Sequence, residues 1–321
     1  MTSDQTQRAA DLAESRILDL TGRSLEALPA WVGDMRDLER LYARGNRLEN
    51  VPDWLASLTR LRDLWLGANR LTSVPESLWT LTSLETLDLS ENRLTVIPDA
   101  LGRLTRLRML DLGHNALPRV PDAIGDLPSL TDYLYLSDNE LTELPATIGR
   151  LTALRYLNAT DNQLTTLPDT IGGMAGLVEI RLYNNRIETL PDSLGALTRL
   201  RELHAMENAL VELPGSIGGL RELRRLVLRG NHLASLPDSI GELSNLVELD
   251  LRNNRLTSLP ETLGRLPRLA YLDVRGNRLT SLPESLSALP SLEKLDLRWN
   301  KLWSHPEWLT RLEHRGCVVL R

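Results

Sequence analysis

Residues 84–104 read Leu-Glu-Thr-Leu-Asp-Leu-Ser-Glu-Asn-Arg-Leu-Thr-Val-Ile-Pro-Asp-Ala-Leu-Gly-Arg-Leu, and variants of this stretch recur along nearly the whole chain. The asparagine of each copy follows the previous one at a constant interval, with a single insertion before the fifth member. The series is Asn46, Asn69, Asn92, Asn115, Asn139, Asn162, Asn185, Asn208, Asn231, Asn254, Asn277 and Asn300. A period of this length is typical of a solenoid, in which each repeat contacts only its neighbours.

The first half of the repeat has the pattern LxxLxLxxNxL and the second half the pattern LPxxLGxL. Together they resemble the 23-residue class of leucine-rich repeats found in bacterial leucine-rich proteins, plant Ras-group proteins and Scribble-type scaffolds. The resemblance covers roughly residues 17–302. It implies an α/β solenoid, a horseshoe with a parallel β-sheet on its concave face and short helical or 3-10 turns on its convex face. It also implies a binding role, without identifying the ligand.

The residue types of one repeat explain this shape. Alternate residues of a strand face opposite sides, so Leu87 and Leu89 point inward and Asp88 points outward. Identical strands then stack in parallel about 4.8 Å apart. Asn92 ends the strand, where its amide can satisfy backbone groups that the turn buries. Pro98 holds the residue before it extended and opens the return segment.

The ends of the array depart from the pattern. We expect an N-terminal helical cap over residues 1–16, about thirteen repeats over residues 17–302 and a C-terminal cap over residues 303–321. Val318 and Leu320 follow Leu295 and Leu297 by one repeat length, which predicts a truncated fourteenth strand with these two residues in the core. Terminal repeats of a solenoid are expected to be atypical.

Composition limits the class of partner and the compartment. The net charge of −6 argues against a nucleic-acid partner, which would need a basic surface. Cys317 is the only cysteine, so no internal disulfide forms, and a reducing compartment is expected. The N-terminus lacks a secretory pattern and no apolar run approaches the ~20 residues of a membrane span, so we expect a cytoplasmic protein without a membrane partner. The alternative is a protein that is exported without a classical signal sequence.

All six tyrosines fall at positions expected on the concave face: Tyr42, Tyr133, Tyr135, Tyr156, Tyr183 and Tyr271. Four of them gather in three consecutive repeats around the extra residue in 131–134, which we interpret as a β-bulge close to a functional site. Tyrosine is enriched at binding hot spots, which favours a recognition surface. The alternatives are the preference of tyrosine for strands and a tolerated slip in the array.

Charge on the predicted concave face is uneven. Repeats three to seven show no basic residue at face positions, and their carboxylates are Asp63, Asp88, Glu91, Asp111, Asp138 and Asp161. With Trp65 and the tyrosines they predict a surface for a basic segment, through charge pairing and cation–π contacts. Repeats ten to thirteen instead carry an arginine column, Arg229, Arg252, Arg275 and Arg298, beside Asp250, Asp273 and Asp296. This column is either a self-neutralised salt-bridge ladder or a set of guanidinium groups for carboxylates or phosphates.

The sequence offers little for catalysis. The histidines show no metal-ligand spacing on a common face, and no nucleophile elbow or phosphate loop is present. We therefore predict no catalytic residue, metal or cofactor, and a non-enzymatic scaffold or adaptor that binds a protein or peptide. The predicted binding residues are Trp65, Asp88, Asp111, Tyr133, Tyr135, Asp138, Tyr156, Asp161, Tyr183, His204, Arg229, Arg252 and Arg275. The alternatives are a structural protein that self-assembles through its caps, and an enzyme or accessory that uses the concave carboxylates.

Overall fold

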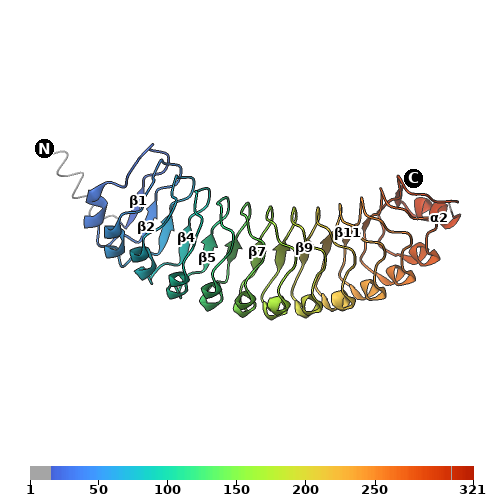
Figure 1. Cartoon of the computed structure of the whole chain (residues 1–321). Coiled ribbons are helices and arrows are strands. Elements are labelled where there is room, and N and C mark those ends of the chain that lie inside the picture. Colours follow the sequence, from blue (N-terminus) through green and yellow to red (C-terminus); the bar gives the residue numbers. More distant parts are fainter. Residues whose placement is uncertain (1–15, 305) are drawn as a thin grey trace. The chain divides into compact units, whose positions relative to one another are not determined.

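A computed structural model describes residues 16–304 and 306–321. The predicted N-terminal helical cap therefore lies, apart from Arg16, outside the described residues. The chain divides into two compact units, residues 1–141 and residues 142–321. In each unit, strands line one side and short 3-10 helices line the other (Figure 1).

The strands are three residues long and follow the sequence order. They are β1 (Ile17–Asp19), β2 (Arg40–Tyr42), β3 (Asp63–Trp65), β4 (Thr86–Asp88), β5 (Met109–Asp111) and β6 (Tyr133–Tyr135) in the first unit. In the second unit they are β7 (Tyr156–Asn158), β8 (Glu179–Arg181), β9 (Glu202–His204), β10 (Arg225–Val227), β11 (Glu248–Asp250), β12 (Tyr271–Asp273), β13 (Lys294–Asp296) and β14 (Val318–Leu320).

A 3-10 helix follows each strand from β1 to β12. These helices are η1 (Ala30–Asp34), η2 (Asp53–Ser57), η3 (Glu76–Thr80), η4 (Asp99–Arg103), η5 (Asp122–Asp126), η6 (Ala146–Arg150), η7 (Asp169–Gly173), η8 (Asp192–Ala196), η9 (Gly215–Gly219), η10 (Asp238–Glu242), η11 (Glu261–Arg265) and η12 (Glu284–Ala288). The α-helix α2 (Trp308–His314) lies between β13 and β14.

Leucines hold the strands in register. In the first unit Leu64 pairs with Leu87 and Leu87 with Leu110, all parallel and all fully buried. The second unit repeats this arrangement, for example where Leu226 pairs with Leu249. The predicted solenoid of parallel strands and short 3-10 turns is thus confirmed.

The asparagine series forms the predicted ladder. Asn69 donates its amide N–H groups to the carbonyls of Leu66 at 2.8 Å and Ala43 at 3.1 Å. Its carbonyl oxygen accepts the backbone N–H of Leu48 at 3.0 Å. One buried side chain thereby satisfies backbone groups of its own repeat and of the preceding one, which makes the turn tolerable in the core.

The glycine that follows the buried aliphatic residue of many return segments is explained by steric constraints. A methyl group on Gly149 would lie 2.2 Å from the carbonyl oxygen of Thr170, and one on Gly172 would lie 2.3 Å from that of Ser193. At these two positions, successive 3-10 helices pack so closely that a Cβ atom would collide with the backbone of the next helix. Each of these helices follows a proline in extended conformation, such as Pro168 with φ −67° and ψ 145°.

The extra residue near β6 does not form the predicted bulge within the strand. β5 and β6 pair without interruption, with Met109 opposite Tyr133 and Leu110 opposite Leu134. Asp132, just before β6, donates its N–H to the carbonyl of Arg108 at 3.0 Å. The additional residue is therefore accommodated before the paired segment, where the connection has no register to keep.

The fourteenth strand is confirmed, but its predicted phase is wrong. Val318 pairs with Lys294 and Val319 pairs with Leu295, so this last step is longer than the regular repeat by a single position. Val318 accordingly faces away from the core and is 54% exposed. The helix α2 replaces the usual 3-10 turn, and Leu309 and Leu312 on it are buried. Among the described residues, no helix has the length and apolar character needed to cross a membrane.

Candidate functional site

The six tyrosines lie on the sheet face, as predicted, and none of them is buried. Within β6, Leu134 is fully buried while Tyr133 and Tyr135 flank it and point the other way. Two aromatic pairs form in the first unit. Tyr42 and Trp65 have ring centroids 6.1 Å apart, and Tyr133 and Tyr135 stack with centroids 5.8 Å apart. Tyr133 is 45% exposed, so part of this aromatic pair faces solvent.

The predicted group of four tyrosines is divided between the two units. Tyr133 and Tyr135 belong to the first, and Tyr156 and Tyr183 belong to the second. In the second unit the guanidinium of Arg181 lies over the ring of Tyr156, 5.6 Å from its centroid. The structure thus pairs Tyr133 with Tyr135 in the first unit, and Tyr156 with Arg181 in the second.

Asp88 is fully buried and already paired, which corrects the prediction that it faces a partner. The guanidinium of Arg44, after β2, donates to the Asp88 carboxylate at 3.0 Å and also pairs with Glu91. The backbone N–H and hydroxyl of Ser90 donate to the same carboxylate at 2.9 Å and 2.6 Å. A methyl group on Gly67 would lie 2.6 Å and 2.8 Å from the carboxylate oxygens of Asp88 and 2.9 Å from Nη1 of Arg44. The absence of a side chain at Gly67 therefore lets Arg44 reach across β3.

Asp111 is the neighbouring carboxylate, and it has no such partner. Burial raises its pKa from 3.8 to about 6. The hydrogen bond that Asp111 accepts from the backbone N–H of Gly113 at 2.9 Å lowers this pKa but does not offset the burial. The charge of Asp88 raises this pKa further, and Arg44 and His114 lower it. Within the described part of the chain, no guanidinium or ammonium group lies within ion-pair distance of Asp111.

The sheet face of the first unit is acidic as a whole. Along β2 to β6 and the residues that follow each strand, two guanidinium groups oppose five carboxylates, which leaves a net charge of −3. These groups are Arg40, Arg44, Asp63, Asp88, Glu91, Asp111 and Asp138. His114 lies 3.4 Å from Asp138 and adds positive charge only when protonated. The acidic surface is therefore present, although Arg44 from repeat two neutralises part of it.

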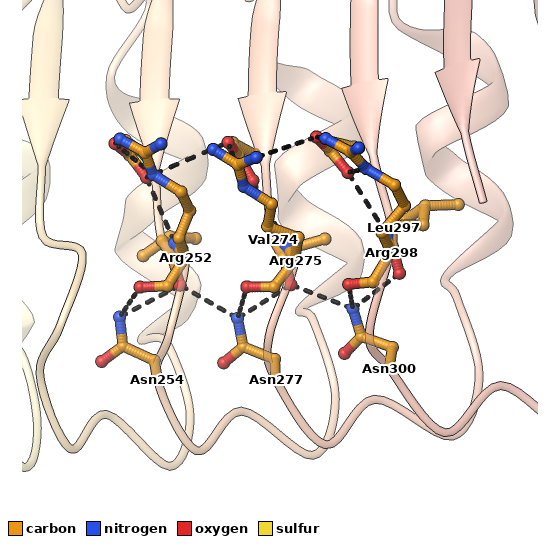
Figure 2. A network of polar contacts seen from close by, with 12 residues as sticks. Arg252, Asn254, Val274, Arg275, Asn277, Leu297, Arg298 and Asn300 are labelled. Carbon is orange, nitrogen blue, oxygen red and sulfur yellow. Dashed lines mark hydrogen bonds and ion pairs between the residues drawn. The ribbon is translucent and has the colours of Figure 1, made fainter.

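In the second unit, the arginine column is a salt-bridge ladder. Arg252 pairs with Asp250 at 2.7 Å, and Arg298 pairs with Asp296 at 2.6 Å. Arg275 reaches Asp296 on the next strand at 3.9 Å, so the rungs are linked. Figure 2 shows the three guanidinium groups in a row above the asparagine ladder. Burial raises the pKa of Asp296, but the hydrogen bonds from Arg298 outweigh it and hold that pKa below its usual range.

These ion pairs favour the interpretation of the arginine column as a self-neutralised ladder over its interpretation as a set of guanidinium groups for an external anion. Arg252 and Arg275, predicted as partner-binding residues, have their guanidinium groups engaged by the chain's own aspartates. Arg229 differs because Val227 stands where the later strands carry aspartate. Among the described residues no carboxylate forms an ion pair with Arg229, so it differs in this respect from Arg252, Arg275 and Arg298.

The remaining predicted residues lie on the sheet face of the second unit. Asp161 accepts a hydrogen bond from the amide of Asn184 at 2.7 Å. His204 belongs to a cluster that the sequence reasoning missed: its Nε2 atom lies 2.9 Å from Glu202 Oε2, and Glu179 lies beside both. The separation of Glu179 and Glu202 by one repeat length was the available signal, because it places them on adjacent strands in register.

Models of known families match most of the chain. A leucine-rich repeat model matches residues 37–94, 59–117 and 84–132, and a leucine-rich repeat region model matches residues 132–214 and 214–314. The chain belongs to the leucine-rich repeat family. No curated protein sequence matches it significantly.

Solved leucine-rich repeat structures resemble this one over nearly its whole length. A leucine-rich repeat protein of Leptospira interrogans is 28% identical, with a TM-score of 0.62, and the alignment covers 98% of this chain and 97% of that one. A TDR receptor is 27% identical, with a TM-score of 0.82 and coverage of 99% and 61%. The ectodomain of the Arabidopsis thaliana receptor kinase GASSHO1/SCHENGEN3, in complex with CASPARIAN STRIP INTEGRITY FACTOR 2, is 32% identical, with a TM-score of 0.77. That alignment covers 97% of this chain but only 41% of the ectodomain.

Proposed function

We propose that this leucine-rich repeat protein is a non-enzymatic scaffold whose sheet face binds another protein or a peptide, and that the first unit selects a basic segment. One observation carries this proposal. The face of the first unit has a net charge of −3, and within it Asp111 is a desolvated carboxylate without a cationic partner among the described residues. A lysine or arginine from a ligand would supply the direct ion pair that Asp111 does not form with any described residue.

The aromatic pairs lie on either side of this carboxylate. Trp65 is on β3, Asp111 is on β5 and Tyr135 is on β6. Three strand spacings, about 14 Å, separate β3 from β6. An extended peptide advances about 3.3 Å per residue, so about four residues span the distance. We therefore expect a ligand with apolar residues at both ends of a short segment and a basic residue between them.

Related structures support a binding role for the fold. GASSHO1/SCHENGEN3 is in complex with CASPARIAN STRIP INTEGRITY FACTOR 2, and the plant peptide hormone receptor RGFR1 is in complex with RGF2. Both receptor chains are longer than this one, which covers 41% and 52% of them. They support a protein or peptide ligand as a class, while the basic segment rests on the charges described above.

The test is selection from a displayed library of random peptides, followed by fluorescence anisotropy with the enriched peptides. Enrichment of lysine or arginine beside aromatic residues is expected. A Tyr133→Ala/Tyr135→Ala double variant and an Asp111→Asn variant should each bind about tenfold more weakly, the loss of one hot-spot contact. Asp99→Asn, an exposed carboxylate on η4, is the matched control and should bind as the wild type does. Equal affinity for all four proteins would rule out this face.

Self-association is the second candidate function, because large apolar side chains are exposed toward the C-terminus. Trp303 is 86% exposed, Trp299 is 71% exposed and Val318 on β14 is 54% exposed. β14 is also a terminal strand with an edge that no further strand covers within the described residues, and such edges favour pairing with another chain. Light scattering over a concentration series should show a rising mass if this candidate holds, and a constant monomer mass if it does not.

A further inference from the structure

The cluster of Glu179, Glu202 and His204 lies on the sheet face of the second unit, on the adjacent strands β8 and β9. One ligand atom from each residue lies within 4.8 Å of the other two. We propose that these three side chains bind a single divalent transition-metal ion of the Zn²⁺ type. This site is separate from the acidic surface of the first unit and does not depend on the proposed peptide ligand.

The geometry fits a shared ion. Two ligands that bind one ion at about 2.1 Å are separated by about 3.0 Å in octahedral and about 3.4 Å in tetrahedral coordination. The Nε2 atom of His204 and the Oε2 atom of Glu202 are 2.9 Å apart. Glu179 stands directly opposite Glu202 in the strand pairing, so its carboxylate completes a triangle from the same face. The strands hold all three Cα atoms in place, and the His204 side chain is only 12% exposed.

Two arginines lie beside the cluster, and each contacts a group outside it. Arg225 contacts Glu202 at 3.4 Å but contacts Glu248 more closely, at 2.8 Å. Arg181 pairs with Glu179 at 2.6 Å while its guanidinium already lies over the ring of Tyr156. A metal ion at Glu202 would leave Arg225 its ion pair with Glu248. At Glu179 the ion would compete with Arg181, which would keep only its contact with the Tyr156 ring.

The ligand types select the class of metal. Imidazole nitrogen suits Zn²⁺, Co²⁺ and Ni²⁺, whereas Ca²⁺ and Mg²⁺ prefer an all-oxygen set. Three protein ligands leave a coordination position open toward the solvent side of the sheet. Water, or a histidine or carboxylate of a bound protein, would complete the coordination.

Isothermal titration of the full chain, with any affinity tag removed, tests the site with Zn²⁺ as the probe. We expect one equivalent of Zn²⁺ per chain, and Co²⁺ should give the visible absorption of a coordinated ion. His204→Gln and Glu179→Gln should each weaken Zn²⁺ binding by at least about tenfold. Circular dichroism confirms that each variant is folded.

Two matched controls separate this site from other ligands. His232→Gln removes a histidine of the next repeat, and Cys317→Ser removes the only thiol; both variants should bind Zn²⁺ as the wild type does. An excess of Ca²⁺ should not displace Zn²⁺. The proposal is overturned if the wild type shows no saturable binding, if His204→Gln binds with unchanged affinity, or if Ca²⁺ competes equally.

Discussion

Replacement of Asp111 by asparagine should stabilise the protein at neutral pH. The asparagine keeps an oxygen that can accept the N–H of Gly113 but carries no charge to desolvate. Burial raises the folded-state pKa of Asp111 to about 6, against an ordinary value of 3.8. The folded state therefore binds this proton more tightly than the unfolded state does.

The sign and size of the effect follow from linkage. A raised carboxyl pKa lowers the free energy of unfolding as pH rises from about 4 to about 6, and the full penalty applies above that range. The shift corresponds to about 3 kcal/mol at most, at about 1.4 kcal/mol for each pKa unit. The advantage of Asp111→Asn over the wild type should thus grow by up to about 3 kcal/mol between pH 4 and pH 7.5.

Urea unfolding of both proteins at several pH values measures this difference. Repeat arrays can lose cooperativity, so circular dichroism and tryptophan fluorescence must give coincident transitions before free energies are compared. Asp99→Asn serves as the control because Asp99 is exposed on η4. A difference between Asp111→Asn and the wild type that stays constant from pH 4 to pH 7.5 would refute the reasoning, since it would mean that Asp111 titrates normally.

Three further outcomes follow from the same contacts. Gly67→Ala should cost about 1–3 kcal/mol, because the new methyl group collides with Arg44 and Asp88; an unchanged urea midpoint would contradict the close packing described above. Asn69→Ala should cost about 1–3 kcal/mol in the same assay, since the buried N–H of Leu48 loses its acceptor, and a loss below about 0.5 kcal/mol would show that the ladder is dispensable. Affinity for a basic peptide should fall as salt rises, because exposed charge pairs are screened, and a salt-independent dissociation constant would exclude charge selection.

The repeat pattern predicted the strands, the asparagine ladder and the side of the sheet on which the tyrosines lie. These features depend on local alternation and on identical neighbours, both of which a sequence displays directly. Leu134 between Tyr133 and Tyr135 is a simple case, because its burial fixes the direction of both rings.

The repeat pattern could not predict which partners the charged ends of long side chains reach. Arg44 crosses a whole repeat to reach Asp88, and only the missing side chain of Gly67 permits that path. The register of Val318 also lay beyond the pattern, since α2 replaces the usual turn and lengthens the connection. In both cases the contact that decides the outcome joins residues of different repeats, so the pattern within a single repeat does not show it.

The central claim is that a ligand binds across the sheet face of the first unit. Hydroxyl-radical footprinting with and without an enriched basic peptide measures this most directly, because it reports the accessibility of individual aromatic side chains. The account predicts that oxidation of Tyr133 and Tyr135 falls on binding while that of Trp303 is unchanged. Protection confined to Trp303 or to Trp31 on η1, with both tyrosines still fully reactive, would contradict it.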